Sequence, residues 1–308
     1  MITRIVCFMI ILFVGISFST VFCQDNSNEL DKFLKKVGEE QAGKYLQPLV
    51  TGLGMSMNAD LYHTAATHAP GGFDITLKAM AAMVPSSQRT FTANLPPQTL
   101  NVAGHQVQVP ARSEEWSTIC GPKRPTGLPD QNLNPGGLDF DLIPFAVPQI
   151  SVGLPGNIDL MARFMSFKVP DVGKIKVFGF GGKHNLKNHI KAPLFPDLSV
   201  QAFYQTFSVG DLVDAKSWAV DLHVSKSMPI LTGYAGIGFE GTTFDYDYTI
   251  TNSVLQTSGT KVTGSIDGEN TFRFVAGARI KITVITLNGS INIGKFTTYS
   301  GGIGFTFR

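Results

Sequence analysis

Residues 272–308 read FRFVAGARIKITVITLNGSINIGKFTTYSGGIGFTFR and contain three runs in which apolar and polar side chains alternate. A period of two is typical of β-strands, because successive side chains point to opposite faces of a pleat. Each run is about ten residues long, roughly the length of a tilted strand that crosses the hydrocarbon core of a membrane. Short connections at residues 283–284 and 295–296 predict that the three strands are antiparallel neighbours.

The composition favours one barrel-sized unit made of many strands and turns. The chain has 308 residues, of which 43% are hydrophobic and 16% charged, and it contains 32 Gly and 23 Phe. Its formal net charge of +2 provides no basic surface, so nucleic acid is not an expected partner. Beyond the first residues no apolar run approaches the length of about 18 residues that a membrane-spanning helix needs. Membrane insertion would therefore require a closed barrel, which leaves no unpaired strand edge in lipid.

The first part of the chain has the pattern of an export signal. Arg4 is followed by the apolar residues 5–18 and by a cleavage site before Gln24, so residues 1–23 are predicted to be a signal peptide. Cleavage would leave Cys120 as the single cysteine, which excludes an internal disulfide and leaves a bridge between two copies as a possible role. Residues 24–52 are predicted to hold a short amphipathic helix, either at the periplasmic interface or as a plug in the barrel mouth.

The pattern at residues 53–61 alternates, and together with residues 73–83 it predicts a hairpin around the turn at residues 69–72. Further strands are predicted at residues 147–154, 158–168, 174–182, 199–207, 218–225 and 230–248. The total is about eleven, whereas a single-chain barrel normally has an even number. We therefore expect an all-β, antiparallel transmembrane β-barrel over residues 53–308, with about 12 strands and a range of 10–14. The alternative is that residues 53–61 thread the lumen.

Residues 85–144 are rich in Pro, Gly, Asn and Gln and have no sustained period, apart from a short hairpin predicted within residues 102–109. If the last strand ends in the periplasm, alternation of direction places this segment outside the cell and the turn at residues 69–72 inside. Long outer loops and short inner turns are typical of outer-membrane barrels. We therefore predict a long extracellular loop at residues 85–144.

Four stretches carry a resemblance to a known family: residues 45–65 (YLQPLVTGLGMSMNADLYHTA), 148–164 (PQISVGLPGNIDLMARF), 179–190 (GFGGKHNLKNHI) and 225–240 (SKSMPILTGYAGIGFE). They resemble an uncharacterised family of bacterial outer-membrane barrels, classed as a domain of unknown function. The resemblance implies the fold and the outer-membrane location, and it implies no activity. The layout is also similar to that of fatty-acid-transporter-like barrels, which have an N-terminal plug. The final strand, with Phe307 near its end, resembles the strand by which barrel-assembly machinery recognises such proteins, although Arg308 follows it.

Motifs that would indicate catalysis or cofactor binding are weak. Residues 236–241 match GxGxxG but lie in a predicted strand, where glycines relieve curvature and no helix follows to bind a phosphate. The pairs His63/His68 and His184/His189 lack further ligands at metal-binding spacing, so we interpret them as solvated loop histidines. GxSxG, HExxH and CxxC are absent from the sequence. We therefore predict no enzymatic activity, no cofactor and no metal.

The polar faces of the predicted strands are the remaining candidates for a functional site. The residues predicted to line the lumen are Asp74, Lys78, Arg163, Asp221, His223, Glu240, Arg273, Arg279 and Lys281. In one interpretation they pair with each other across strands and stabilise the wall. In the other, Arg163, Arg273 and Arg279 line a pore and favour anions.

The function predicted first is passive passage of small or hydrophobic molecules across the outer membrane, with an unidentified ligand. One alternative is a closed barrel that acts as a surface scaffold or adhesin through residues 85–144. Another is a soluble, exported lipocalin-like barrel, whose apolar side faces inward, and a third is a membrane-embedded hydrolase. Long strands, and aromatic residues near strand ends at Trp218, Tyr248, Tyr299 and Phe307, favour contact with outer-membrane lipid.

Overall fold

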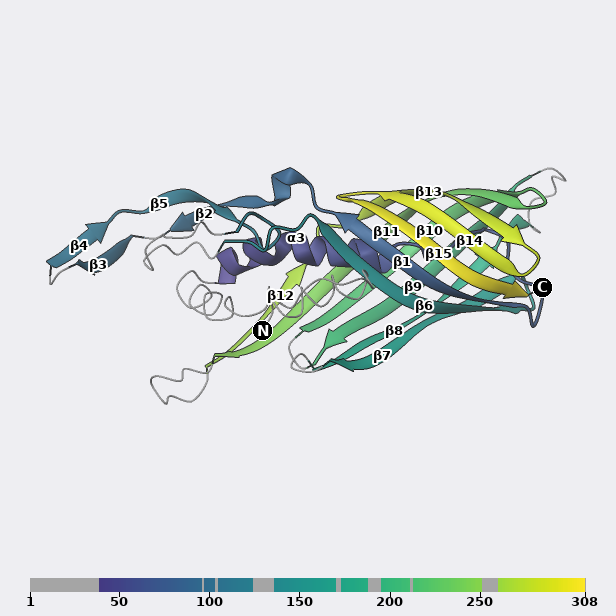
Figure 1. Ribbon diagram of the computed structural model, residues 1–308, viewed down its shortest axis with the longest axis horizontal. Coiled ribbons are helices and arrows are strands. Elements are labelled where there is room, and N and C mark those ends of the chain that lie inside the picture. The colour runs from purple at the N-terminus through teal and green to yellow at the C-terminus, as the bar shows by residue number, and fades with distance from the viewer. Residues whose placement is uncertain are drawn as a thin grey trace.

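The computed structural model describes residues 39–95, 97–102, 105–123, 136–169, 173–187, 195–210, 213–250 and 260–307. Within them one antiparallel sheet closes into a barrel (Figure 1). The strands of the barrel, in spatial order, are β10 (Val213–Ser227), β9 (Asp197–Val209), β8 (Gly173–Asn185), β7 (Ile158–Val169), β6 (Leu142–Leu154), β1 (Phe73–Met83), β15 (Thr297–Phe307), β14 (Ile285–Ile293), β13 (Phe272–Ile282) and β11 (Leu231–Ile250). Pairing between β10 and β11 closes the ring. The predicted signal peptide lies outside the described residues.

The all-β barrel predicted from the sequence is confirmed, and its strand number is lower than the central prediction. Ten strands form the ring in the described part of the chain, instead of about twelve. An eleventh strand of the sheet, β12 (Thr260–Asp267), pairs only with the last eight residues of β11 and lies outside the barrel. One of the eleven runs counted in the sequence, residues 53–61, is not a strand.

Residues 53–58 belong instead to helix α3 (Glu39–Asn58). The helix contacts β1 and β6, and also β10 and β11 on the opposite side of the ring, so its C-terminal part lies in the lumen, while its first turns extend beyond the rim (Figure 1). It continues through Gly43 and Pro48 without interruption. No described helix, α3 included, is both long and apolar enough to span a membrane.

Beyond α3 the chain continues through the lumen to the other end of the barrel. Asp60 adopts a left-handed conformation with φ of 51° just after the helix, a common way for a helix to end. Residues 59–69 then run without regular structure to the turn that leads into β1. In this turn Gly71 has a φ of 78°, a conformation that suits glycine. We call residues 39–69 the plug. The turn end of the barrel is where β1 begins and β15 ends, and the loop end is the opposite one.

The segment predicted as a long loop contains regular structure. It begins with a short helix, η2 (Ser86–Gln88), and continues as an arm of four strands. These strands are β2 (Thr90–Leu95), β3 (Gln98–Val102), β4 (His105–Val109) and β5 (Arg112–Ser117). β2 pairs with β5 and β3 pairs with β4, so the arm is a long two-stranded ribbon that projects beyond the loop end (Figure 1). The hairpin predicted within residues 102–109 corresponds to β3 and β4.

The arm joins the barrel through an apolar core at the loop end. Tyr45 of α3 packs there with Trp116, Ile119 and Cys120. The Tyr45 carbonyl accepts a hydrogen bond from the Ile119 amide at 3.0 Å. Cys120 is fully buried, so the predicted bridge to a second copy is wrong for this conformation. Burial raises the pKa of the Cys120 thiol to about 12, since a thiolate is poorly solvated in this core.

The outer face of the barrel is apolar and the inner face is polar. Phe164, Ile282 and Phe305 are 66%, 62% and 62% exposed, and 34 large hydrophobic side chains are exposed among the described residues. A soluble monomer rarely exposes a continuous apolar surface of this extent, whereas a barrel in lipid requires one. The apolar sides therefore face outward, which is the reverse of a lipocalin-like barrel. Of the four predicted interfacial aromatics, Trp218, Tyr299 and Phe307 are exposed, and the Tyr248 side chain lies outside the described part.

Candidate functional site

The interior of the barrel is a binding site for the main chain of the plug. Arg163, on β7, donates from Nη1 to the Met57 carbonyl at 2.7 Å and from Nη2 to the carbonyls of Ala59 and Asp60 at 3.1 Å each. Its Nε donates to Oε1 of Gln149 at 2.9 Å. The last carbonyls of a helix have no partner within the helix. The guanidinium group therefore supplies, from the wall, the donors that the end of α3 lacks.

Two further cations of the wall reach the same place. Lys78 donates to the Asp60 carbonyl, and its Nζ lies 3.6 Å from the Asp60 carboxylate. Arg273 donates to the Asn58 carbonyl. α3 has no basic residue in its own last turn. Positive charge near the C-terminal end of a helix is favourable, because the helix dipole is negative there. The wall thus provides both the hydrogen bonds and the charge that hold this end of α3.

The same pattern continues along the extended part of the plug. The Leu61 carbonyl accepts a hydrogen bond from Gln149 at 3.1 Å, and the Ala65 carbonyl accepts one from Asn185 at 2.8 Å. The Ala66 carbonyl accepts one from Lys183 at 2.8 Å. In all, the wall donates to eight carbonyls of the plug: those of Met57, Asn58, Ala59, Asp60, Leu61, Thr64, Ala65 and Ala66. Buried backbone carbonyls need such partners, which explains why the inner face is polar.

A buried ion-pair network anchors Arg273. Its Nη2 lies 2.8 Å and 3.0 Å from the two Asp221 oxygens, and its Nη1 lies 2.7 Å from Glu240 Oε2. All three side chains are buried. An unpaired charge at such a depth would be strongly destabilising, so two carboxylates hold one guanidinium where it can reach α3.

An aromatic stack lies near the middle of the lumen. Tyr62 of the plug stacks on His223 of β10, with ring centroids 3.8 Å apart and planes 9° apart. Tyr234 meets Tyr62 edge-on at 6.0 Å. A side chain at Gly236 would collide with the Tyr62 hydroxyl, because a Cβ atom there would lie 2.3 Å from it. Gly236 belongs to the GxGxxG match, and its role is to make room for the plug.

The two plug histidines are buried near the turn end, so their interpretation as solvated loop residues is wrong. His63 Nε2 lies 3.0 Å from Asp74 Oδ2, and His68 Nε2 lies 3.8 Å from the same oxygen. His68 Nδ1 is 3.1 Å from Asp159 Oδ2, and Lys183 pairs with Asp159 at 3.0 Å. No group of three or more metal-ligand side chains with suitable geometry occurs among the described residues. The histidines connect the plug to the wall.

The structure places the predicted lumen residues as follows. Arg279 is partly buried, with Nη1 3.3 Å from His63 Nδ1, and Lys281 is partly exposed close to the turn end. The other seven are buried: Asp74, Lys78, Arg163, Asp221, His223, Glu240 and Arg273. Each of the three arginines proposed to line a pore contacts the plug.

The charged side chains that contact the plug or pair with each other in the described interior form a balanced set, from which the partly exposed Lys281 near the turn end is left out. Its five basic side chains are Lys78, Arg163, Lys183, Arg273 and Arg279, and its five acidic ones are Asp60, Asp74, Asp159, Asp221 and Glu240. With the histidines neutral, the sum of these ten groups is zero. Asp60 is the one member contributed by the plug. The plug therefore completes the charge balance as well as filling the space.

Sequence reasoning missed several residues that bind the plug. Gln149, Gln205 and Asn185 donate to its carbonyls but carry no charge, so they did not stand out. For Gln149 and Gln205 the signal was present, because both occupy inward positions of alternating strands. Lys183 lies one residue beyond the predicted end of its strand, which is why it was overlooked.

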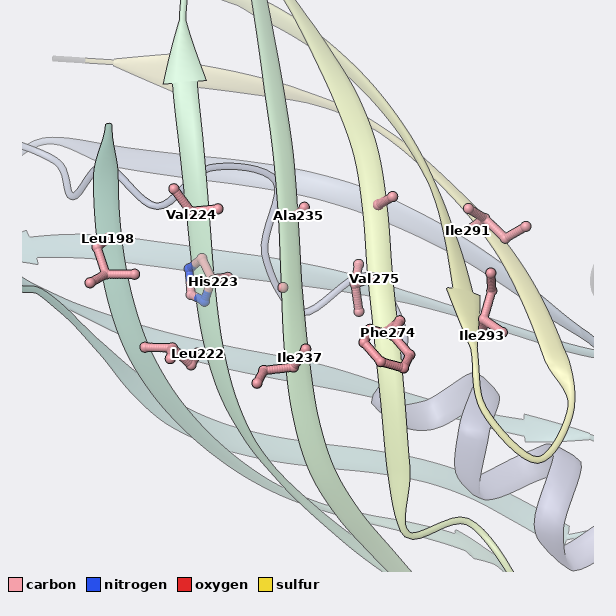
Figure 2. Close-up of a pocket in the computed structure, with 12 residues that line it drawn as sticks. Leu198, Leu222, His223, Val224, Ala235, Ile237, Phe274, Val275, Ile291 and Ile293 are labelled. Atoms are coloured by element: carbon pink, nitrogen blue, oxygen red, sulfur yellow. The ribbon is translucent and has the colours of Figure 1, made fainter. Parts of the chain in front are cut away.

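The outer wall carries an apolar pocket of about 470 Å³ across β10, β11, β13 and β14 (Figure 2). Leu222, Ile237, Phe274 and Ile293 line it and are exposed on the outer face. His223 and Val275, which are buried, also border it. Because most of the lining is apolar and outward-facing, we regard the pocket as part of the lipid-facing surface.

Comparison with solved structures gives several matches of low similarity. The outer membrane protease OmpT from Escherichia coli is 9% identical, with 79% of this chain and 100% of that chain covered and a TM-score of 0.34. The translocator domain of the autotransporter NalP from Neisseria meningitidis is 12% identical, with coverage of 89% and 99% and a TM-score of 0.31. The attachment invasion locus protein Ail of Yersinia pestis is 8% identical, with coverage of 78% and 99% and a TM-score of 0.20. At these values the likeness concerns the type of barrel alone.

None of the curated proteins matches the sequence. A family described as "Family of unknown function (DUF6588)" matches residues 1–307, almost the whole chain. The resemblance predicted from four stretches of sequence is thereby confirmed, and the protein belongs to this family of unknown function.

Proposed function

We propose that the protein is a closed barrel of the bacterial outer membrane that acts as a surface scaffold and presents the arm outside the cell. The observation that carries this proposal is the filled lumen. The wall binds eight carbonyls of the plug, and the charged side chains that contact the plug or each other form a balanced set. A pathway for solutes would instead leave these polar side chains free to face water. The apolar outer face supports the membrane location.

The arm is the part of the molecule best suited to meet a partner. It is a ribbon of β2–β5 that projects from the loop end, where the apolar core around Tyr45 and Trp116 fixes its base. Of the connections at the turn end, those at residues 155–157, 228–230 and 283–284 are short, and the one between β8 and β9 spans residues 186–196. The arm, at the loop end, is much longer than any of them. Long segments of outer-membrane barrels face the outside. We therefore place the loop end outside the cell and the turn end in the periplasm.

Passage of small molecules is a second candidate, and one observation favours it. The plug is a single continuous stretch, so its displacement would leave a ten-stranded lumen lined by ionisable side chains. In this alternative the described conformation is the closed state. It requires that the contacts between plug and wall break reversibly.

Recording of single channels in planar bilayers distinguishes the two candidates. The full-length protein is compared with a variant that lacks residues 39–68. A scaffold should show no openings as the full-length chain, whereas the deletion variant should conduct if it inserts. Frequent openings of the full-length chain would contradict the scaffold and favour passage. Gel migration before and after heating, which separates folded from unfolded barrels, shows whether each variant has folded.

Partners follow from the same proposal. Outer-membrane lipid surrounds the apolar face, and barrel-assembly machinery would recognise β15, the final strand. We assign no enzymatic activity, cofactor or small-molecule ligand to the protein.

A further inference from the structure

The plug passes through the barrel in one direction, from the loop end to the turn end. α3 starts at the loop end, where Glu40 and Lys44 form an exposed ion pair at 2.7 Å, with side chains 74% and 39% exposed. The plug then continues to the turn end, where the Gly71 amide donates to the Gly153 carbonyl at 3.0 Å. The chain therefore enters the lumen from the loop end and leaves it at the turn end, next to the start of β1.

From this polarity we infer that the plug enters the lumen from the outer opening of the barrel, which displays the start of α3 on the outer surface, beside the arm. The inference rests on the proposed function, because it takes the loop end as the outer one. An N-terminal helix resting at the periplasmic side of the barrel would have the opposite sidedness. The protein thus has two displayed elements, the arm and the start of α3, on one membrane anchor.

The chemistry of the lumen specifies this direction. Lys78, Arg163 and Arg273 surround the C-terminal end of α3, and all three donate hydrogen bonds to carbonyls there. Lysine and arginine side chains have no acceptor atom. A helix inserted with its N-terminus at this depth would present N–H groups and a positive dipole to three cations. Such an arrangement would leave donors facing donors, so the wall accepts the plug in one direction only.

The loop end is built to receive the start of the helix. Glu40, in the first turn, places negative charge at the positive end of the dipole and remains in contact with solvent. One turn further, Tyr45 is buried among Ile119 and Cys120 at the base of the arm. The beginning of α3 and the base of the arm thus form one unit. A partner that reaches the base of the arm will also meet the first turn of α3.

Site-directed labelling of intact cells tests the inference. Single cysteines are introduced at exposed positions and treated with a maleimide attached to a polymer too large for outer-membrane pores. Glu40→Cys reports the start of the plug, Thr92→Cys reports the arm, and Ala69→Cys reports the turn end. Cys120 stays in place because it is buried, and the unmodified chain gives the background. Lys44→Cys is a second probe of the same end of the plug, in case Glu40→Cys fails to assemble.

We expect Glu40→Cys to be labelled to the same level as Thr92→Cys. Ala69→Cys should stay at background until the outer membrane is permeabilised. Labelling of Thr92→Cys without labelling of Glu40→Cys or Lys44→Cys would overturn the inference and leave the proposed scaffold intact. If Ala69→Cys is labelled in intact cells and Thr92→Cys is not, the barrel has the reverse orientation, and the proposed function fails together with the inference.

Discussion

Replacing Arg163 should loosen the plug more than any single change on the outer face. Arg163→Ala removes five hydrogen bonds, of which three go to plug carbonyls and two to glutamines of the wall. Two of these carbonyls keep another donor, because Gln205 also reaches Met57 and Lys78 also reaches Asp60. The Ala59 carbonyl keeps no donor among the described contacts.

The magnitude follows from these partners. One buried carbonyl without a donor costs about 1–3 kcal/mol, and hydrogen bonds from a charged group contribute about 1.5–3 kcal/mol. Part of this loss of stability is offset. Arg163 makes no hydrogen bond to a carboxylate, so burying its charge is costly, and its removal abolishes that cost. The net loss for plug docking is therefore about 2–4 kcal/mol. At about 1.4 kcal/mol for each factor of ten, this corresponds to an increase in the undocked fraction of roughly 30- to 700-fold.

Planar-bilayer recordings and thiol accessibility measure that fraction independently. Openings should become more frequent in Arg163→Ala, and a cysteine introduced at the buried position Thr64 should react faster with a small maleimide. Arg163→Lys should fall between the native chain and the alanine variant, since one ammonium group cannot span three carbonyls. Lys176→Ala, on the exposed face of β8, should stay within about 0.5 kcal/mol of the native chain. A folded Arg163→Ala protein with native accessibility and no openings would refute the assigned role of Arg163.

Three further predictions concern the plug and its surroundings. Gly54→Ala should destabilise the folded protein by about 1–3 kcal/mol, because the Cβ of the new alanine would lie 2.6 Å from Thr242 Cβ. Gly43→Ala should instead stabilise α3 by up to about 1 kcal/mol, because a Cβ at that position would have no atom within 4 Å. Thermal unfolding that ranks the two variants in the opposite order would contradict this packing. Cys120, whose pKa is raised to about 12, should resist thiol reagents at pH 8 in the folded protein and react at once after denaturation, and equal rates in the two states would show that it is not buried. Tyr62→Phe should leave the free energy of unfolding unchanged or raise it by up to about 1–3 kcal/mol, since the buried Tyr62 hydroxyl makes no hydrogen bond within the described residues, and a loss of stability measured by denaturant titration would reveal a missing partner.

The strands of the wall could be predicted because each one lies between two different environments. The three runs in residues 272–307 correspond closely to β13, β14 and β15. In each, the outward side chains meet an apolar surrounding and the inward ones meet the plug, so the period of two is imposed on the sequence itself. The same rule identified Arg163 and Arg273 as inward residues. It could not identify their partners, which lie 103 to 106 positions away from Arg163 and 215 away from Arg273.

The first choice for residues 53–61, a strand of the wall, was wrong for the converse reason, whereas the alternative that they thread the lumen agrees with their contacts to the inner wall. The later turns of α3, residues 48–58, are buried on all sides and have no solvent face, so their sequence need not show an amphipathic stripe. Residues 53–61 alternate because glycine and serine fall at Gly54 and Ser56, where the helix approaches the wall. Gly54 lies against Thr242, and the Ser56 hydroxyl donates to the Ile143 carbonyl at 2.8 Å. Packing in three dimensions, rather than local propensity, determines the structure of this segment.

The polar inner face has a different cause from that of an open pore. Water can solvate side chains of many kinds and positions, so an open channel does not require donors at fixed places along its length. Here the donors occur opposite successive carbonyls of one chain, from Arg163 near the end of α3 to Lys183 near the turn end. Since a buried backbone carbonyl requires a donor, the wall has the composition that suits a polypeptide in the lumen. Apolar substitutions at these donor positions should therefore release the plug while the outer face, and with it membrane insertion, remains unchanged.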